Sequence, residues 1–191
     1  MRLQLQMQLE GRQHRDDDQL PLAQGQEGTR EDLAVAVLQD PAGEIRAALR
    51  EGATLARLDE TLLQLIPFAG YARAINAFAV LQEIAPHVPR APRHRSDRRK
   101  GEALCRRIYG PVYEKMIARM AGFHPALAAW ILEDGYGKVL SRPILSIRER
   151  ELIVVALLSA LKLPLQLESH VRGALRVGAT KGEVAAMLKV R

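Results

Sequence analysis

The spacing of apolar residues predicts a chain made almost entirely of helices. Leu55, Leu58, Leu62, Leu65 and Ile66 recur three or four residues apart, so they share one face of a helix over LARLDETLLQLI. The same kind of spacing predicts further helices over REDLAVAVLQ, AGEIRAALRE, YARAINAFAVLQEI, RERELIVVALLSALK, LQLESHVRGALRV and EVAAMLKV. Ala and Leu dominate the composition and aromatic residues are scarce, which also favours helices. The predicted fold class is therefore all-α.

Helix-capping residues and proline predict where several of these helices begin and end. Ser146 with Glu149, and Thr180 with Glu183, have the spacing of capping boxes, in which each side chain bonds a free backbone N–H of the other residue. Pro67 is expected to interrupt the first helix described above, because proline cannot donate the next helical hydrogen bond.

One nine-residue sequence segment occurs twice in the chain. Residues 46–54 read RAALREGAT and residues 172–180 read RGALRVGAT, which agree at seven of nine positions. This agreement indicates a duplicated helical unit whose apolar face is buried by the other copy or by another subunit. The first copy has Glu44 where the second has His170. We therefore predict a single site in each chain, in the second copy.

Composition shifts divide the chain into four parts. We predict an irregular tail over residues 1–28, a degenerate first unit over 29–85, a basic linker over 86–101 and a second unit over 102–191. Residues 89–100 carry five Arg and one Lys against one Asp. Such a run can contact nucleic acid, but it has no interleaved aromatic residue, so we interpret it as a solvated linker and expect no nucleic-acid partner.

The net charge, the cysteine count and the length of the apolar runs indicate in which compartment the protein is expected. The chain has 28 Lys and Arg against 22 Asp and Glu, a formal net charge of +6, and one cysteine, Cys105. One cysteine excludes an internal disulfide framework and fits a reducing compartment. No apolar run approaches the roughly 20 residues of a membrane span, and the N-terminal residues lack a signal-peptide pattern. We therefore predict a cytoplasmic protein with no membrane partner.

The second unit carries a set of short motifs that resembles a known family. The motifs are Tyr136-Gly137, Arg142-Pro143, Arg150-Glu151-Leu152, and His170 followed by RGAL and GAT. Together they resemble the carboxymuconolactone decarboxylase family, which includes alkylhydroperoxidase D-like proteins. The resemblance covers residues 105–191, with a weaker copy over 29–84. It implies an alkylhydroperoxidase D-like helical fold of two related units, assembled as a homo-oligomer, either a trimer or a hexamer.

The resemblance separates two kinds of chemistry. The peroxidase branch of the family has two cysteines, seven and four residues before the histidine, and these positions hold Leu163 and Gln166 here. A peroxidatic thiolate and its resolving thiol are both missing, and Cys105 lies too far away in sequence to replace a local pair. A hydroperoxide reductase is therefore the least favoured function.

The decarboxylase branch does not need the cysteine pair. The resemblance then implies a proton relay of His170 and Glu151 acting on a small carboxylated lactone or a related enolisable acid. Arg142, Arg150 and Arg172 are the candidate carboxylate clamps, because arginine binds carboxylates through two parallel hydrogen bonds. We expect no organic cofactor. The other histidines lack metal-ligand spacing, so we expect no metal site either.

Each of these roles has a structural alternative. A histidine on a helix is often structural, and Glu151 can instead pair with Arg148 or Arg150. Arg172 lies two residues after His170, so the two side chains leave the helix in different directions, and Arg172 can serve a subunit contact. A non-catalytic helical assembly protein that keeps the family scaffold is therefore the main alternative to the enzyme.

Overall fold

The computed structural model describes residues 40–86 and 95–189, and within these ranges it contains helices and no strand, which confirms the predicted all-α class. The predicted tail over 1–28, the predicted helix over 30–39 and residues 87–94 of the basic linker lie outside the described residues. The α-helices are α3 (Pro41–Arg50), α4 (Leu55–Ala69), α5 (Tyr71–Ile84), α6 (Arg98–Tyr109), α7 (Tyr113–Phe123), α8 (Pro125–Trp130), α9 (Ile147–Ala160), α10 (Pro164–Arg176) and α11 (Lys181–Met187). A 3-10 turn, η1 (Gly110–Val112), and a π-helix, η2 (Ile131–Leu140), complete them.

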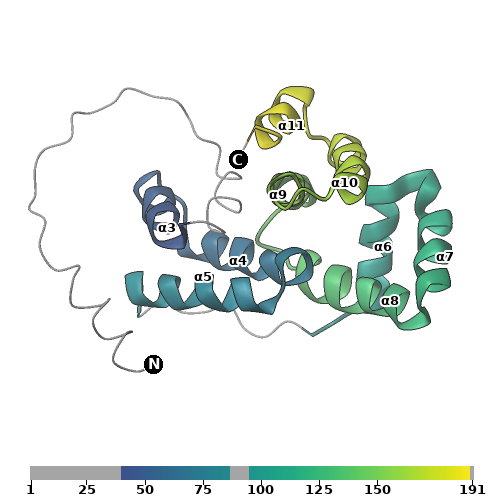
Figure 1. Ribbon diagram of the computed structural model, residues 1–191, viewed down its shortest axis with the longest axis horizontal. Coiled ribbons are helices and arrows are strands. Elements are labelled where there is room, and N and C mark those ends of the chain that lie inside the picture. The colour runs from purple at the N-terminus through teal and green to yellow at the C-terminus, as the bar shows by residue number, and fades with distance from the viewer. Residues whose placement is uncertain (1–39, 87–94, 190–191) are drawn as a thin grey trace, which may run out of the picture.

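Helix α9 lies near the centre of the molecule (Figure 1), with α10 and α11 beside it on one side and α3 to α5 on the other. Every residue from 150 to 158 is buried. Ile153 and Leu157 of α9 join a core built mainly from the first unit, which includes Ile45, Leu62 and Leu81. On another face of α9, Leu152 and Val155 pack with α10 and α11. The two units therefore bury their apolar faces against one shared helix.

The repeated phrase folds in the same way in both copies. Gly52 and Gly178, which end the repeat helices, both have positive φ angles, +85° and +101°. The following alanine N–H donates to a carbonyl five residues earlier at 2.8 Å in the first copy and 2.9 Å in the second. Thr54 and Thr180 then cap the next helices. This match supports the interpretation of the repeat as a duplicated helix–turn–helix unit.

The predicted interruption at Pro67 was wrong. Helix α4 continues through Pro67 to Ala69 and ends at Gly70, whose φ angle is +86°. Pro67 lies in the last turn, so the helix loses one backbone hydrogen bond three residues before a glycine would end it in any case. The continuation matters because it carries Phe68 toward the second unit. Both predicted capping boxes, at Ser146 and Thr180, are present.

Helix α6 begins inside the predicted linker. The Asp97 side chain accepts a hydrogen bond from the Lys100 backbone N–H at 3.1 Å and so caps the helix. Three basic residues, Arg98 to Lys100, form its first turn. None of the helices within the described residues is long and apolar enough to cross a membrane.

Two glycines let α6 and η2 approach closely. A Cβ on Gly101 would lie 2.2 Å from the Leu132 carbonyl oxygen, and a Cβ on Gly137 would lie 2.7 Å from the Asp97 carbonyl oxygen. Neither position has space for a larger residue. The close crossing, together with the wide turns of the π-helix, places Tyr136 against α6.

Candidate functional site

The structure brings His170 and Glu151 into direct contact. His170 lies in the middle of α10 and Glu151 in the first turns of α9, the preceding helix. The His170 Nδ1 atom lies 3.0 Å from the Glu151 Oε2 atom. Glu151 is fully buried and His170 is 5% exposed. Glu151 therefore faces this imidazole and not solvent, while a catalytic role for the pair stays a prediction.

Two tyrosines extend this pair into a chain of hydrogen bonds. The Tyr109 hydroxyl, from the end of α6, lies 3.3 Å from the His170 Nε2 atom. The Tyr136 hydroxyl, from η2, donates to the Tyr109 hydroxyl at 3.3 Å. Burial raises the pKa of both tyrosines above their usual value. We call Glu151, His170, Tyr109 and Tyr136 the buried polar chain.

One glycine, Gly173, and the aromatic ring of Phe68 pack around His170. A Cβ on Gly173 would lie 2.7 Å from both the Glu151 Oε2 atom and the Ile108 Cγ2 atom, so this glycine lets α10 lie close to α9 and α6. The Phe68 ring, from the end of α4, meets the imidazole edge-on with 5.6 Å between ring centroids. The first unit therefore contributes one wall to the site in the second.

The structure places two of the predicted clamp arginines in a buried ion-pair cluster. The Arg150 Nη2 atom donates to Glu60 Oε2 at 2.8 Å, and its Nη1 atom donates to Gln64 Oε1 at 3.2 Å. The Arg142 Nε atom donates to Glu60 Oε1 at 2.6 Å. Burial lowers the pKa of Arg150 below its usual value, although Glu60 opposes the shift. We call Glu60, Gln64, Arg142 and Arg150 the inter-unit cluster, because it joins α4 to α9 and to the segment between η2 and α9.

The third predicted clamp residue, Arg172, lies apart from this arrangement. Its side chain is mostly exposed and pairs with the exposed carboxylate of Glu168 one turn earlier on α10. The structure thus brings the predicted acid–base pair together but leaves each of the three arginines engaged with a protein carboxylate.

Cys105 is fully buried beside this site. Burial, with a contribution from the nearby Glu151 carboxylate, raises the pKa of the Cys105 thiol to about 12. At neutral pH the group is a thiol and not a thiolate, so it lacks the nucleophilic form that peroxide reduction requires. This geometry argues against the hydroperoxide reductase alternative.

Sequence reasoning missed three members of the site. No role was assigned to Tyr109 or Phe68 from the sequence, and Tyr136 was included only as part of a motif. A tyrosine in a chain with few aromatic residues was the available signal for Tyr109, since buried tyrosine hydroxyls usually have a hydrogen-bond partner.

The arrangement can move or hold a proton. Imidazole, carboxyl and phenol groups in a hydrogen-bonded line can each accept or release one. Within residues 40–86 and 95–189, no group of three or more His, Cys, Asp or Glu side chains could hold a metal ion.

These features define an all-α protein with a buried histidine–glutamate pair on adjacent helices of a repeated unit. Residues 125–191 match the model of the "Carboxymuconolactone decarboxylase family". The chain therefore carries a domain of this family in its C-terminal part, which confirms the resemblance found in the sequence.

Two curated relatives carry the same printed name, "Peroxisomal protein 2". The one from Schizosaccharomyces pombe is 32% identical over 138 residues, which covers 67% of this chain and 63% of the relative. The one from Saccharomyces cerevisiae is 27% identical over 164 residues, which covers 69% of this chain and 58% of the relative. The chain thus matches about three fifths of the length of each relative. No solved structure matches the chain.

Proposed function

We propose that this protein is a non-catalytic helical assembly protein that keeps the carboxymuconolactone decarboxylase family scaffold. One observation carries the proposal: each arginine predicted to hold a substrate carboxylate is already paired with Glu60 or Glu168. Breaking a buried ion pair such as Arg150–Glu60 costs about 3–5 kcal/mol, which a substrate would have to repay. The names printed for the two relatives refer to a compartment and not to a reaction.

We further propose that the partner in the assembly is a second copy of the chain, in a trimer or hexamer. Residues 121–130 read AGFHPALAAW and are exposed over most of their length. Phe123 and Trp130 are 63% and 62% exposed, although such large aromatic side chains usually anchor protein interfaces. We call residues 121–130 the aromatic patch. The aromatic patch contains His124 but no Asp, Glu, Lys or Arg. The cores of homo-oligomer interfaces are depleted of charged residues in the same way.

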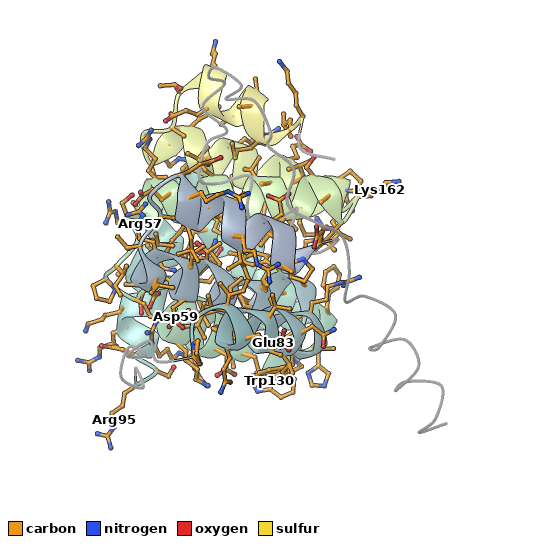
Figure 2. The ribbon with its side chains drawn as sticks, turned by 90° about the vertical axis from the view of Figure 1, so that its left-hand side faces the viewer. Arg57, Asp59, Glu83, Arg95, Trp130 and Lys162 are labelled. Carbon is orange, nitrogen blue, oxygen red and sulfur yellow. The ribbon has the colours of Figure 1, made fainter. Side chains whose placement is uncertain are left out.

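Light scattering on the purified chain tests the assembly. Trp130→Glu combined with Phe123→Glu is expected to convert an oligomer to a monomer, because each change buries a charge at the interface. Leu165→Glu is the matched control, because Leu165 is 73% exposed on α10. Trp130 lies at the lower edge of the molecule in Figure 2, well away from Lys162 in the turn before α10. A monomeric unaltered chain, or an assembly lost only in the control, would contradict the proposal.

The names of the relatives bear on the compartment. Both refer to the peroxisome, which does not fit the predicted cytoplasmic location. We propose that this chain acts in the peroxisome. A fluorescent fusion of the full chain that overlaps with a peroxisomal marker would support this, and a uniformly cytoplasmic signal would overturn it.

A second candidate function is favoured by the contact between His170 and Glu151. On this proposal the chain is a carboxymuconolactone decarboxylase-like enzyme in which His170 protonates the substrate carbon and Glu151 orients the imidazole. Arg142 or Arg150 would have to exchange Glu60 for the carboxylate of the substrate.

Turnover measurements separate the two functions. Carbon dioxide release from a carboxylated lactone that disappears in His170→Gln, while the oligomer persists, would establish the enzyme. No release by the unaltered chain, with the oligomer intact, is the result expected from the assembly proposal.

A further inference from the structure

Helix α5 is apolar around most of its circumference. On its inner side, Ala74, Ala77 and Leu81 are buried, and the helix packs against α3 and α4. On the adjoining side, Tyr71 and Ile75 are 69% and 62% exposed. Figure 1 shows α5 along the lower edge of the described molecule, with α3 and α4 above it. A helix that is apolar on more than one face is normally covered on each of them, so the outer face of α5 is suited to contact another surface.

The exposed apolar residues of α5 fall on one face of the helix. Successive residues of an α-helix are about 100° apart, so positions three, four and seven apart share a face. This face carries Tyr71, Ala72, Ile75, Phe78, Ala79 and Gln82, which we call the α5 stripe. The two charged residues of α5, Arg73 and Glu83, lie about 160° and about 80° from Ile75 around the helix. The α5 stripe therefore contains no charge.

We propose that the α5 stripe is a two-fold contact between two copies of this chain, which pairs two trimers into a hexamer. The contact depends on the proposed assembly function, and it selects the hexamer over the trimer. A hexamer of two trimers needs one contact that repeats around a three-fold axis and another that joins identical surfaces across two-fold axes. The aromatic patch supplies the first contact and the α5 stripe supplies the second.

The order of side chains along the α5 stripe suits an antiparallel pair of α5 helices. With Ile75 on the two-fold axis, residues equally far before and after it come together in the two copies. Tyr71 of either copy then meets Ala79 of the other, and Phe78 meets Ala72. Large side chains placed against alanine let two helices interlock without voids.

The absence of charge favours a second copy as the occupant of the α5 stripe. The chain carries a formal net charge of +6, so two copies repel each other at long range. A two-fold axis also places each side chain near its own counterpart, and a charge beside the axis would meet a like charge. An uncharged face is therefore the surface on which two copies can meet with the least repulsion.

One α5 stripe is too small to hold two single chains together. Helix α5 has 14 residues, and one face of it is expected to bury less than the roughly 1,200 Å² found at the lower end of stable interfaces. Two trimers present three pairs of stripes, and linked contacts reinforce one another. Loss of the aromatic patch should therefore give single chains, whereas loss of the α5 stripe should leave trimers.

Light scattering on the full chain tests the contact. The unaltered chain is expected to be a hexamer. Ile75→Glu is expected to be a trimer of half that mass, because the substitution brings two like charges together at each two-fold axis. Asn76→Glu is the matched control, because Asn76 is exposed on the same helix but points about 100° away from Ile75. This control should remain a hexamer.

A thiol at position 75 provides a second test, in which the assembly stays intact. Two helices packed about 8–10 Å apart bring facing Cα atoms within about 5 Å, a distance that a disulfide can span. Ile75→Cys is therefore expected to link two chains on mild oxidation, with a doubled mass that reductant reverses. Asn76→Cys should not link them. The native Cys105 is buried and does not compete.

The possible results separate this contact from the assembly proposal. An unaltered trimer would overturn the α5 contact alone, and it is the result expected if another segment of the chain or another protein occupies the stripe. An unaltered monomer would overturn both proposals. A hexamer that persists in Ile75→Glu, that dissociates equally in Asn76→Glu, or that gives no linked chains with Ile75→Cys would again overturn only the α5 contact.

Discussion

At the scale of single residues, the inter-unit cluster is the most consequential feature that the sequence did not reveal. Arg150 lies in a motif typical of the family, and we predicted a substrate carboxylate as its partner. Its actual partner, Glu60, is ninety residues earlier, in a segment that reads as an ordinary amphipathic helix. Periodicity shows which face of a helix is apolar but not which buried charge another helix will supply.

The inter-unit cluster predicts an unequal response to charge removal. Glu60→Ala should lower the free energy of unfolding by about 3–5 kcal/mol, because it leaves Arg150 buried without its carboxylate. Glu168→Ala removes one partner of the exposed Arg172 pair and should cost less than about 1 kcal/mol. Urea denaturation of both variants measures the difference. Equal losses would show that Glu60 does not neutralise Arg150.

Replacing both members of the buried pair sharpens this test. Glu60→Leu combined with Arg150→Met should be far more stable than Glu60→Ala, because no charge is then left without a partner. A double variant as unstable as the single one would show that packing, and not charge, explains the loss.

At the scale of elements, periodicity predicted the helices well but not their irregularities. The span of α5 and the capped starts of α9 and α11 follow from apolar spacing and polar caps. The passage of α4 through Pro67 and the change from α8 to the π-helix η2 do not. Pro67 lies in the last turn of α4, where the loss of one hydrogen bond is tolerated. Helix η2 instead crosses α6 closely at Gly101 and Gly137, a contact that local sequence cannot specify.

The close crossing of α6 and η2 predicts a low tolerance for one methyl group. Gly137→Ala should destabilise the chain by about 1–3 kcal/mol, because its Cβ would lie 2.7 Å from a backbone oxygen that cannot move independently. Gly135→Ala is the matched control within the same helix, since a Cβ there meets nothing within 4 Å. Thermal unfolding of both variants measures the effect. A control as unstable as Gly137→Ala would place the cause in helix propensity.

At the scale of the whole molecule, the two units are joined into one body by α9. Duplication was visible in the sequence because a nine-residue phrase is repeated. The sharing of α9 was not visible, since apolar spacing does not show which helix of one copy packs against the other. The core that contains Ile153 and Leu157 shows that the first unit, although it lacks a histidine at the corresponding position, buries part of the helix that positions Glu151.

A shared core predicts that both units unfold together. Leu157→Ala should lower the free energy of unfolding by about 2–5 kcal/mol. The midpoint measured by circular dichroism and the midpoint measured by the fluorescence of Trp130, the only tryptophan, should fall equally. Leu165→Ala, at an exposed leucine, should change either midpoint little. Two separate midpoints in Leu157→Ala would mean that the units are energetically independent.

The π-helix offers a way to recognise which homologous chains keep the tyrosine pair. Its i to i+5 bonding uses one more residue in each turn than an α-helix does. A homologue one residue shorter between the positions of Trp130 and Ser141 would be able to wind the same stretch as ordinary α-helix. The residue in the place of Tyr136 would then face another direction, and its hydroxyl would no longer reach Tyr109. Segment length at this one place, counted in an aligned sequence, would thus distinguish chains that have inherited the pair from those that have not.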